Sequence, residues 1–504
     1  MSEHSATTVF FRKWLPISLL CIVPLLLLTY TTLRAHLLSL THDECGSFAI
    51  WTNYDIFTCR TNPECWGTAN LHWLYVLLMK ITVGLFGNSE LAIRLPALFG
   101  HIIYLVFSFK LVKWVVDTPR LPSYLTPHTS YLTLFGFLLL NINAYLLEFH
   151  SLARGYGLAM SMMMMSLYYL ARWVESGRLW PLLGTLGGAA LAVMSNFTLL
   201  VYFACLLAVI AGVVLVAFLT KDEKKAVRAK WAAGGSMAFV ALLGWLLHNP
   251  IRILRERGEF EWGRESFYET YKSLVHCSLY GGRYLKMYNL ELFGGLFFLL
   301  LLAATGLAVA QFSKKPKDTA ARFYLAAVLL PLLAALAAVA QHWILGTNYQ
   351  VDRTAIMFIP LCALVVFLFF KHLLAQKRSG WRVALAVMVG VFCVVHFGRV
   401  AQLRYTSEWG YDAETKNMMA YMDAKIPKGT KVKLGVNWLF HPASAYYQKR
   451  FGYDFTEPPV YEKTLRTDGF YDYYYVQPDD VLALDSLYDV ETRFSWVGVL
   501  LRKK

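Results

Sequence analysis

The sequence predicts a polytopic α-helical membrane protein with about eleven transmembrane helices and a soluble α/β domain after the last of them. The chain of 504 residues is 57% hydrophobic and only 16% charged, which is too apolar for a water-soluble globule of this length. A helix rises roughly 1.5 Å per residue, so about 20 apolar residues cross the hydrocarbon core of a bilayer. We expect spans near residues 15–38, 93–115, 129–147, 156–174, 182–196, 198–219, 232–248, 291–311, 323–342, 354–371 and 382–399.

The distribution of basic residues predicts the orientation of these helices. Lysine and arginine mark the cytoplasmic side of membrane proteins. Here they gather in every second loop, around residues 12–13, 110–120, 172–178, 221–230, 314–322 and 371–382. We therefore expect a cytoplasmic N-terminus and an extracytoplasmic segment 400–504. The same pattern accounts for the net charge of +15 without a nucleic-acid partner.

Two of the predicted outer loops are too long to be simple connections. Loop 39–92 is expected to carry amphipathic helices that lie along the membrane interface, with a transmembrane helix over residues 71–87 as the alternative. Loop 250–290 is rich in Arg, Glu and Tyr and is expected to line or cover a substrate cavity. The first span has no small-residue cleavage site after it, so we expect a retained helix rather than a signal peptide.

The composition changes after Arg399 to mixed polar and aromatic residues, which divides the chain into a membrane domain 1–399 and an outer domain 400–504. Alternating periodicities in the second part predict a small α/β sandwich. We expect helices over 411–424 and 443–449 and strands over 431–436, 471–476 and 495–501.

Four of the eight cysteines fall in predicted outer segments, where an oxidising compartment permits disulfides. Cys59 and Cys65 bracket a loop short enough to close, so a bridge between them is predicted. A second bridge between Cys45 and Cys277 stays open, with free thiols as the alternative. Zinc is disfavoured because the spacing matches no common finger.

Polar side chains cluster on the predicted outer face, within an otherwise apolar chain. A carboxylate there can act as a general base, and arginine in a poorly hydrated site can hold a phosphate through charge-assisted hydrogen bonds. This combination fits glycosyl transfer from a phosphate leaving group, with the sugar delivered on a membrane lipid because no nucleotide-sugar pool exists outside the cytoplasm. The clusters are Asp43/Glu44, Asn70/His72, Glu148/His150/Arg154/Tyr156 and His342/Tyr349/Asp352/Arg353.

Several motifs resemble those of the GT-C glycosyltransferases of the protein mannosyltransferase and aminoarabinose transferase type. Thr41-His42-Asp43-Glu44 is similar to the acidic motif of their first outer loop. The resemblance covers roughly residues 10–175 and 340–420. Its other motifs are 70–80, 85–90 with 93–96, Ala153-Arg154-Gly155-Tyr156 and the run 352–360 that opens a late span.

The resemblance implies a GT-C fold, a polyprenyl-phosphate-linked sugar donor, inverting transfer and an extracytoplasmic active site. Asp43 would be the general base, with Glu44 as the second catalytic candidate. Arg353 would hold the donor phosphate, with Arg154 and Arg94 as further candidates. The residues expected to position substrate are His72, His150, Tyr156, Tyr349 and Glu148. Relatives carry an acidic residue shortly after the Arg/Tyr segment, where this chain runs Leu-Ala-Met-Ser-Met, and Glu148 is the possible substitute.

Other readings of these residues remain open at this point. Asp43 and Glu44 could cap an interfacial helix, and Arg94 and Arg353 could snorkel at the ends of spans. A divalent metal at His42, Asp43 and Glu44 would lack a complete ligand set, so neither a metal nor another cofactor is predicted. The rival functions are a lipid-linked sugar transporter and a non-catalytic binder of such lipids. The acceptor could be a glycan, a lipid or a protein, and a bacterial inner membrane is favoured because no retrieval signal is seen.

Overall fold

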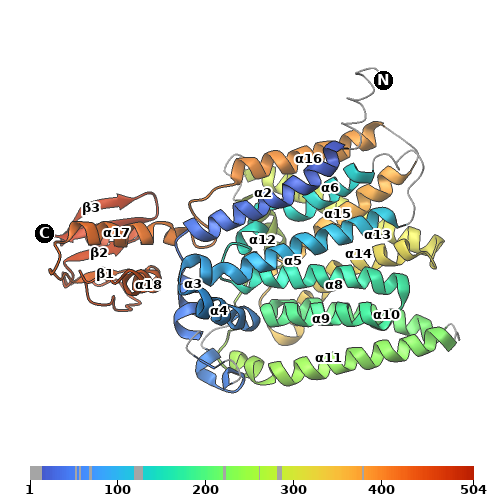
Figure 1. Cartoon of the computed structure of the whole chain (residues 1–504), viewed down its shortest axis with the longest axis horizontal. Coiled ribbons are helices and arrows are strands. Elements are labelled where there is room, and N and C mark those ends of the chain that lie inside the picture. The colour runs from blue at the N-terminus through green and yellow to red at the C-terminus, as the bar shows by residue number, and fades with distance from the viewer. Residues whose placement is uncertain are drawn as a thin grey trace.

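The computed structural model describes residues 14–51, 54–55, 58–66, 71–118, 129–219, 223–259, 262–280, 287–376 and 380–504. Most of the chain forms a bundle of helices that run along the long axis of the molecule. A small region of helices and strands lies at one end of this bundle (Figure 1). The long helices are α2 (Leu15–Leu37), α5 (Glu90–Asp117), α6 (Thr129–Asn141), α8 (Gly155–Ser176), α9 (Leu179–Ser195), α10 (Leu200–Leu219), α11 (Glu223–Glu256), α13 (Met287–Lys314), α14 (Thr319–Leu345), α15 (Phe358–Ala375) and α16 (Gly380–Val400).

Every span predicted from the sequence falls on one of these helices. Within the described ranges, 8 helices are long and apolar enough to cross a membrane, which makes the chain an integral membrane protein. The other three predicted spans, on α6, α8 and α9, are not among the eight. The predicted span 129–147 is divided after Asn141, because the side chain of Asn143 accepts a hydrogen bond from Leu146 N and starts the separate short helix α7 (Ala144–Phe149).

The helices alternate in direction, so the connections fall into two sets at opposite ends of the bundle (Figure 1). The basic connections lie at the end near the N-terminus, where Lys371 Nζ donates to Thr118 O at 2.6 Å between α15 and α5. The connections predicted as outer loops gather at the other end, beside the C-terminal region. The loops that the charge pattern assigns to one side of the membrane therefore lie at one end of the bundle, and the loops that it assigns to the other side lie at the opposite end.

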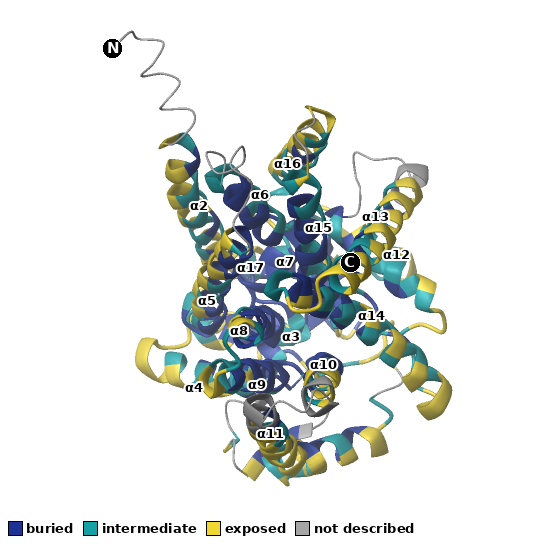
Figure 2. Cartoon of the chain, turned by 90° about the vertical axis from the view of Figure 1, so that its right-hand side faces the viewer, coloured by how far each residue is buried: buried dark blue, intermediate teal, exposed yellow. Residues whose placement is uncertain are grey.

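Helix α8 packs against α5 and α9 and is buried along most of its length. Helices α11 and α16 lie at the outside of the bundle and show much exposed surface (Figure 2). A Cβ at Gly188 of α9 would lie 2.9 Å from Ser166 N of α8, so glycine lets the two helices pack backbone to backbone. Lipid-facing helices surround a close-packed interior, and α8 begins at the end of the bundle where the polar clusters lie.

The first outer loop contains the short helices α3 (His42–Gly46) and α4 (Trp73–Phe86). Helix α4 has 14 residues, which span about 21 Å at roughly 1.5 Å per residue, too little to cross a bilayer core of about 30 Å. Between them, Cys59 and Cys65 form a disulfide with their Cα atoms 5.4 Å apart. Cys45 and Cys277 are free thiols, so the second bridge that the sequence left open is absent from the described structure.

The C-terminal region is a four-stranded mixed sheet with helices α17 (Thr415–Lys425) and α18 (His441–Phe451). The strand order is β1-β2-β4-β3, and only β1 and β2 are parallel. The strands are β1 (Leu434–Val436), β2 (Tyr473–Val476), β3 (Tyr488–Phe494) and β4 (Gly498–Lys503). The sequence missed β3, an edge strand that is mostly polar and exposed and is interrupted by a bulge between Val490 and Thr492, so it lacks an alternating apolar pattern.

Contacts with the first outer loop fix this region against the bundle. Tyr447 Oη accepts a hydrogen bond from Leu40 N at 2.8 Å, and Tyr446 Oη donates to Asn88 O at 2.6 Å. Lys416 Nζ pairs with Glu90 at 2.7 Å. Helix α18 thus covers α3, and the segment between α16 and α17 passes over the end of the bundle.

Candidate functional site

The acidic motif of the first outer loop forms the N-terminus of α3. Thr41 Oγ1 accepts from Glu44 N at 3.3 Å, and Glu44 Oε2 accepts in return from Thr41 N at 2.9 Å. This reciprocal pair is a capping box, which the Thr-x-x-Glu spacing favours. The box starts a helix of only 5 residues and places Asp43 on its first turn.

Glu44 and Arg94 form a fully buried ion pair. Arg94 donates through Nε to Glu44 Oε1 at 2.7 Å and through Nη2 to Oε2 at 2.6 Å. Its other donors reach the backbone oxygens of Ala35, Leu38 and Ser39 at 2.8 to 3.1 Å. The catalytic role of Glu44 and the phosphate-binding role of Arg94 stay predictions, but burial and these bonds occupy the polar groups of both side chains and favour a structural role.

Asp43 instead faces Arg154, the residue that precedes α8. Arg154 Nη2 lies 3.3 Å from Asp43 Oδ2, and Nη1 donates to Ser47 Oγ at 3.0 Å. The guanidinium is fully buried, whereas the Asp43 side chain is 13% exposed. Asp43 Oδ2 accepts no hydrogen bond from any residue within the described ranges, although it is buried. A carboxylate oxygen held in this way is available to a group that enters the site.

Arg353 reaches the same place from the 3-10 helix η8 (Asp352–Ala355), which precedes α15. Its Nη1 donates to Glu408 Oε2 at 2.6 Å, and its guanidinium lies 5.1 Å from the Trp409 ring centroid. Arg154 lies 6.0 Å from the same ring, so one indole adjoins both arginines. The buried Nε of Arg353 donates to no acceptor in the described chain.

The electrostatics of Arg353 connect it with the residues of the first outer loop. Burial disfavours its charged form, but the neighbouring Tyr156, Glu408 and Asp43 outweigh this cost and raise the pKa of Arg353 above its ordinary value. Arg353 and Asp43 come from opposite ends of the sequence, yet they act on one another. The structure therefore places the Asp43 carboxylate within electrostatic reach of the Arg353 guanidinium.

His72 closes the site from the start of α4. Its ring lies 5.0 Å from the Tyr156 ring, and a Cβ at Gly155 would lie 1.9 Å from Ser195 O and 2.7 Å from the His72 Cβ. Glycine at 155 is thus required for His72 to approach α8. Burial lowers the pKa of His72 well below its ordinary value, and the guanidiniums of Arg154 and Arg353 lower it further, so the ring is neutral.

Glu148, predicted to bind substrate, is fixed by several hydrogen bonds. It accepts from Arg34 Nη2 at 2.8 Å, from Tyr280 Oη at 2.6 Å and from Ser407 N at 2.9 Å. Burial raises the pKa of Glu148 in spite of the Arg34 charge. These bonds hold the segment after α16 in place and favour a structural role, and its substrate contact stays a prediction.

His150 and Tyr349 each stack on a histidine. The His150 ring is fully buried and lies 4.7 Å from the His101 ring, inside the bundle. Tyr349 stacks on His342 at 4.5 Å, and its backbone pairs with Arg264. The predicted substrate contacts of His150 and Tyr349 stay predictions; both nitrogens of the His150 ring have no hydrogen-bond partner among the described residues.

The sequence missed the segment that lies between α16 and α17. Besides Glu408 and Trp409, it supplies Asp412, whose Oδ2 accepts from His42 N at 2.6 Å. Burial raises the pKa of Asp412 well above its ordinary value, and Asp43 and Glu44 raise it further. An acidic and aromatic run directly after the last span, Thr-Ser-Glu-Trp-Gly-Tyr-Asp at 406–412, was the available signal.

His150 predicts a measurable pH dependence of stability. Burial lowers its pKa well below the ordinary value, and His101 adds to the effect, so only the unfolded chain takes up a proton as the pH falls below about 6.5. The unfolding free energy then falls with decreasing pH, by at most about 1.4 kcal/mol per pH unit for this group. In His150→Phe, the thermal midpoint followed by tryptophan fluorescence should fall less between about pH 7.5 and about pH 5 than in the parent protein. His276→Asn, at an exposed histidine, is the control and should keep the parent slope; an unchanged slope in His150→Phe would contradict the assignment.

Comparisons with known proteins support the fold. No protein-family model and no curated protein sequence matches the chain. The structure is similar to that of ArnT from Cupriavidus metallidurans in the apo state, with a TM-score of 0.52 and 14% identity over 96% of this chain and 97% of that chain. The same protein bound to undecaprenyl phosphate gives a TM-score of 0.50 and 13% identity over the same shares. The archaeal oligosaccharyltransferase AglB from Archaeoglobus fulgidus, in complex with an inhibitory peptide and a dolichol-phosphate, gives 0.48 and 11% over 94% of this chain and 71% of that chain.

The likeness to ArnT extends over nearly the full length of both chains and shows the fold alone. The chain has a GT-C-like fold, which confirms the fold class expected from the sequence.

Proposed function

We propose that the protein is a glycosyltransferase that moves a sugar from a polyprenyl-phosphate donor to a glycan, lipid or protein acceptor on the extracytoplasmic face of a membrane, with inversion at the sugar carbon. Asp43 is the general base, and Arg353 and Arg154 hold the donor phosphate. His72 and Tyr156 line the position of the sugar. A crystal structure of the similarly folded ArnT holds undecaprenyl phosphate, which agrees with this class of donor.

One observation carries the proposal: three buried polar atoms of the site have no hydrogen-bond partner among the described residues. They are the acceptor Asp43 Oδ2, the donor Arg353 Nε and the ring nitrogen His72 Nε2. Buried polar atoms are normally paired, because desolvation without a hydrogen bond costs about 1–3 kcal/mol for each group. An acceptor, a donor and a neutral imidazole in one site suit a substrate that brings both a hydroxyl or amine and an anionic phosphate.

The chemistry follows from these groups. The acceptor oxygen or nitrogen attacks the anomeric carbon and passes its proton to Asp43, while the bond from that carbon to the phosphate oxygen breaks. The electron pair leaves with the lipid phosphate, and the guanidiniums stabilise the negative charge that develops on it. Trp409 lies against both arginines, and the full burial of Arg154 strengthens its interaction with a negative charge.

The charged residues of the spans disfavour a transporter. A translocation path needs ionisable groups near the middle of several spans. Arg34 and Arg94 instead lie near the helix ends beside the site, and each is fixed in a buried ion pair. Neither is placed to accompany a substrate across the membrane.

The proposal is tested by turnover of defined donors. The full-length protein in liposomes is incubated with a panel of polyprenyl-phosphate sugars and candidate acceptors, and mass spectrometry follows the sugar-linked and the free lipid phosphates. We expect consumption of one donor with release of the lipid phosphate and transfer of the sugar to an acceptor. Binding of the donors without consumption of any of them would contradict an enzyme and favour the binding protein considered above.

Arg353 should contribute mainly through the donor phosphate. Hydrogen bonds to charged groups are worth about 1.5–3 kcal/mol, so Arg353→Gln is expected to lower kcat/KM for the donor by about 10- to 150-fold. The measurement is the initial rate as a function of donor concentration. Arg404→Gln, at an exposed arginine of the segment that also carries Glu408, is the matched control and should keep the parent rate. Equal rates for the parent and Arg353→Gln would remove Arg353 from the phosphate site.

A further inference from the structure

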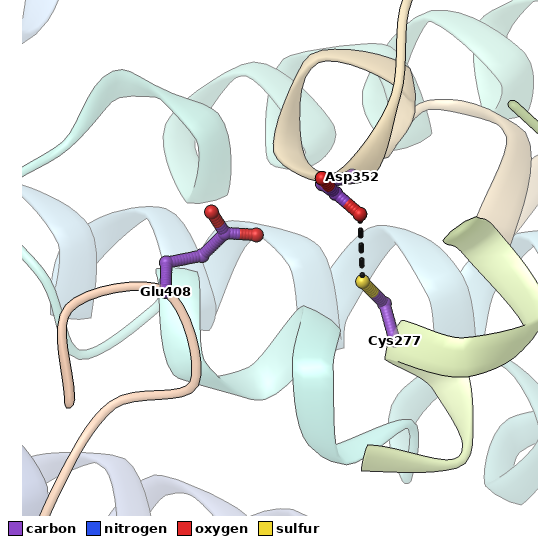
Figure 3. Close-up of side chains that lie close together, drawn as sticks. All are labelled: Cys277, Asp352 and Glu408. Atoms are coloured by element: carbon purple, nitrogen blue, oxygen red, sulfur yellow. Dashed lines mark hydrogen bonds between the residues drawn. The ribbon is translucent and has the colours of Figure 1, made fainter. Parts of the chain in front are cut away.

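A second cluster of chemically active side chains lies beside Arg353. Cys277 belongs to the last turn of α12 (Phe267–Ser278), Asp352 opens η8, and Glu408 follows α16. Figure 3 shows the three side chains directed toward one another from three separate segments. Cys277 Sγ donates to Asp352 Oδ1 at 3.4 Å, and one ligand atom from each residue lies within 4.8 Å of the other two.

We propose that Cys277, Asp352 and Glu408 bind a divalent transition-metal ion, with zinc as the best match. Zinc takes sulfur at about 2.3 Å and carboxylate oxygen at about 2.0–2.2 Å, so its ligand atoms lie roughly 3.5 Å apart in a tetrahedron. The Cys277–Asp352 separation of 3.4 Å already matches this spacing, and the other separations, at most 4.8 Å, must shorten for all three atoms to ligate one ion. A thiolate among the ligands selects zinc, iron or cobalt over magnesium and calcium, which prefer oxygen alone.

The charge around the cluster favours a cation. Two carboxylates face one thiol, and the guanidinium of Arg353 pairs with Glu408 Oε2 from the far side. Tyr145 Oη donates to the other oxygen, Glu408 Oε1. A carboxylate has about four acceptor positions, so Glu408 can keep both neighbours and still ligate a metal. The three protein ligands leave a fourth position for water or another oxygen ligand.

A cavity of about 260 Å³ adjoins the cluster at Asp352 and is also bounded by Ser273 and His276 of α12. Charged side chains of both signs line it, with Glu269 and Glu291 beside Arg264 and Lys272. An ion can reach Asp352 from this cavity, whereas Cys277 is buried and does not line it.

The proposed ion would join three segments that come from separate parts of the chain. It ties α12 and the segment after α16 to η8, where Arg353 follows Asp352 in the chain. Arg353 would then be oriented from both sides, through its backbone neighbour and through Glu408. The site stands independently of glycosyl transfer, because its ligands differ from Asp43, Arg154 and His72.

Cobalt binding tests the site directly, without any assay of turnover. The full-length protein in detergent is stripped of metal with a chelator and titrated with Co²⁺, and absorption spectra record the thiolate-to-cobalt charge-transfer band and the d–d bands. We expect one equivalent of Co²⁺ per chain with a band that excess Zn²⁺ abolishes. Absence of the band in the parent protein, or its persistence in Cys277→Ser, overturns the proposal.

Variants of the other ligands separate this site from unspecific binding. Asp352→Asn and Glu408→Gln should each weaken the binding of Co²⁺ by about 10-fold or more while the charge-transfer band remains. Cys45→Ser removes another free buried thiol and should leave binding unchanged. Unchanged affinity in both carboxylate variants would overturn the three-ligand site. Thermal midpoints measured with and without Zn²⁺ on the parent protein give a second readout, since a ligand that binds the folded state raises the midpoint.

Discussion

Asp43→Asn is expected to lower turnover of the lipid-linked sugar by about 100- to 10,000-fold, the range that a positioned general base contributes. Asparagine has nearly the same shape as aspartate but cannot take the proton of the acceptor. Asp43 is 13% exposed, and the buried Arg154 keeps its hydrogen bonds to Asp43 O and Ser47 Oγ in the variant, so the fold should be retained. The measurement is single-turnover transfer in liposomes, with donor binding determined in parallel on the same preparation.

The informative result is a loss of transfer without a loss of donor binding. Donor binding should stay within a few-fold of the parent protein, since the arginines hold the phosphate, while the rate of transfer collapses. Asp55→Asn changes an exposed aspartate of the same outer loop and should leave both quantities unaltered. Transfer at the parental rate in Asp43→Asn would exclude Asp43 as the base and with it the mechanism proposed above.

Much of the architecture could be predicted because it is set by local and periodic signals. Apolar stretches marked the helices, and the Thr-x-x-Glu spacing marked the start of α3. The alternation of basic and non-basic loops predicted which connections lie at the same end of the bundle (Figure 1). Breaks inside an apolar stretch were harder to predict. The break between α6 and α7 depends on one residue, Asn143, which caps the N-terminus of α7.

Roles within the site depended on packing that no local pattern encodes. Asp43 and Glu44 are adjacent carboxylates, yet one faces a cluster of unpaired polar atoms and the other is enclosed by Arg94. Arg94 and Arg353 have the same chemistry and both lie near the start of a span. Only the tertiary structure shows that the first is fully buried in fixed hydrogen bonds and the second keeps an unused donor.

The segment between α16 and α17 is a second case in which tertiary packing, and not a local sequence pattern, places residues in the site. Trp409 lies more than 250 residues from Arg154 in the sequence, and it adjoins Arg154 because Glu148 and Arg34 hold this segment over the bundle. The ligands of the proposed metal site come from three segments for the same reason. A sequence reading that searches for ligands at short spacing cannot find such a group.

The buried Glu44–Arg94 pair predicts the largest effect on stability. Removing one partner of a buried ion pair leaves an uncompensated charge and costs about 3–5 kcal/mol, so Glu44→Gln and Arg94→Met are each expected to lower the thermal midpoint steeply. The double variant should be less destabilised than the sum of the two, because the unpaired charge is absent. It should not recover the parental stability, since the backbone oxygens of Ala35, Leu38 and Ser39 lose their donor.

The exposed pair Lys113–Asp117 provides the matched control. Its atoms are 2.8 Å apart, but its side chains are 52% and 51% exposed, so Asp117→Asn should cost less than about 1 kcal/mol. Thermal and denaturant unfolding in detergent, followed by tryptophan fluorescence, measure all four variants. Activity per folded molecule then distinguishes a structural role of Glu44 from a catalytic one. Transfer at the parental rate by the folded fraction of Glu44→Gln fits a structural role. A folded Glu44→Gln that is as inactive as Asp43→Asn would instead assign Glu44 a part in the reaction and contradict a purely structural role.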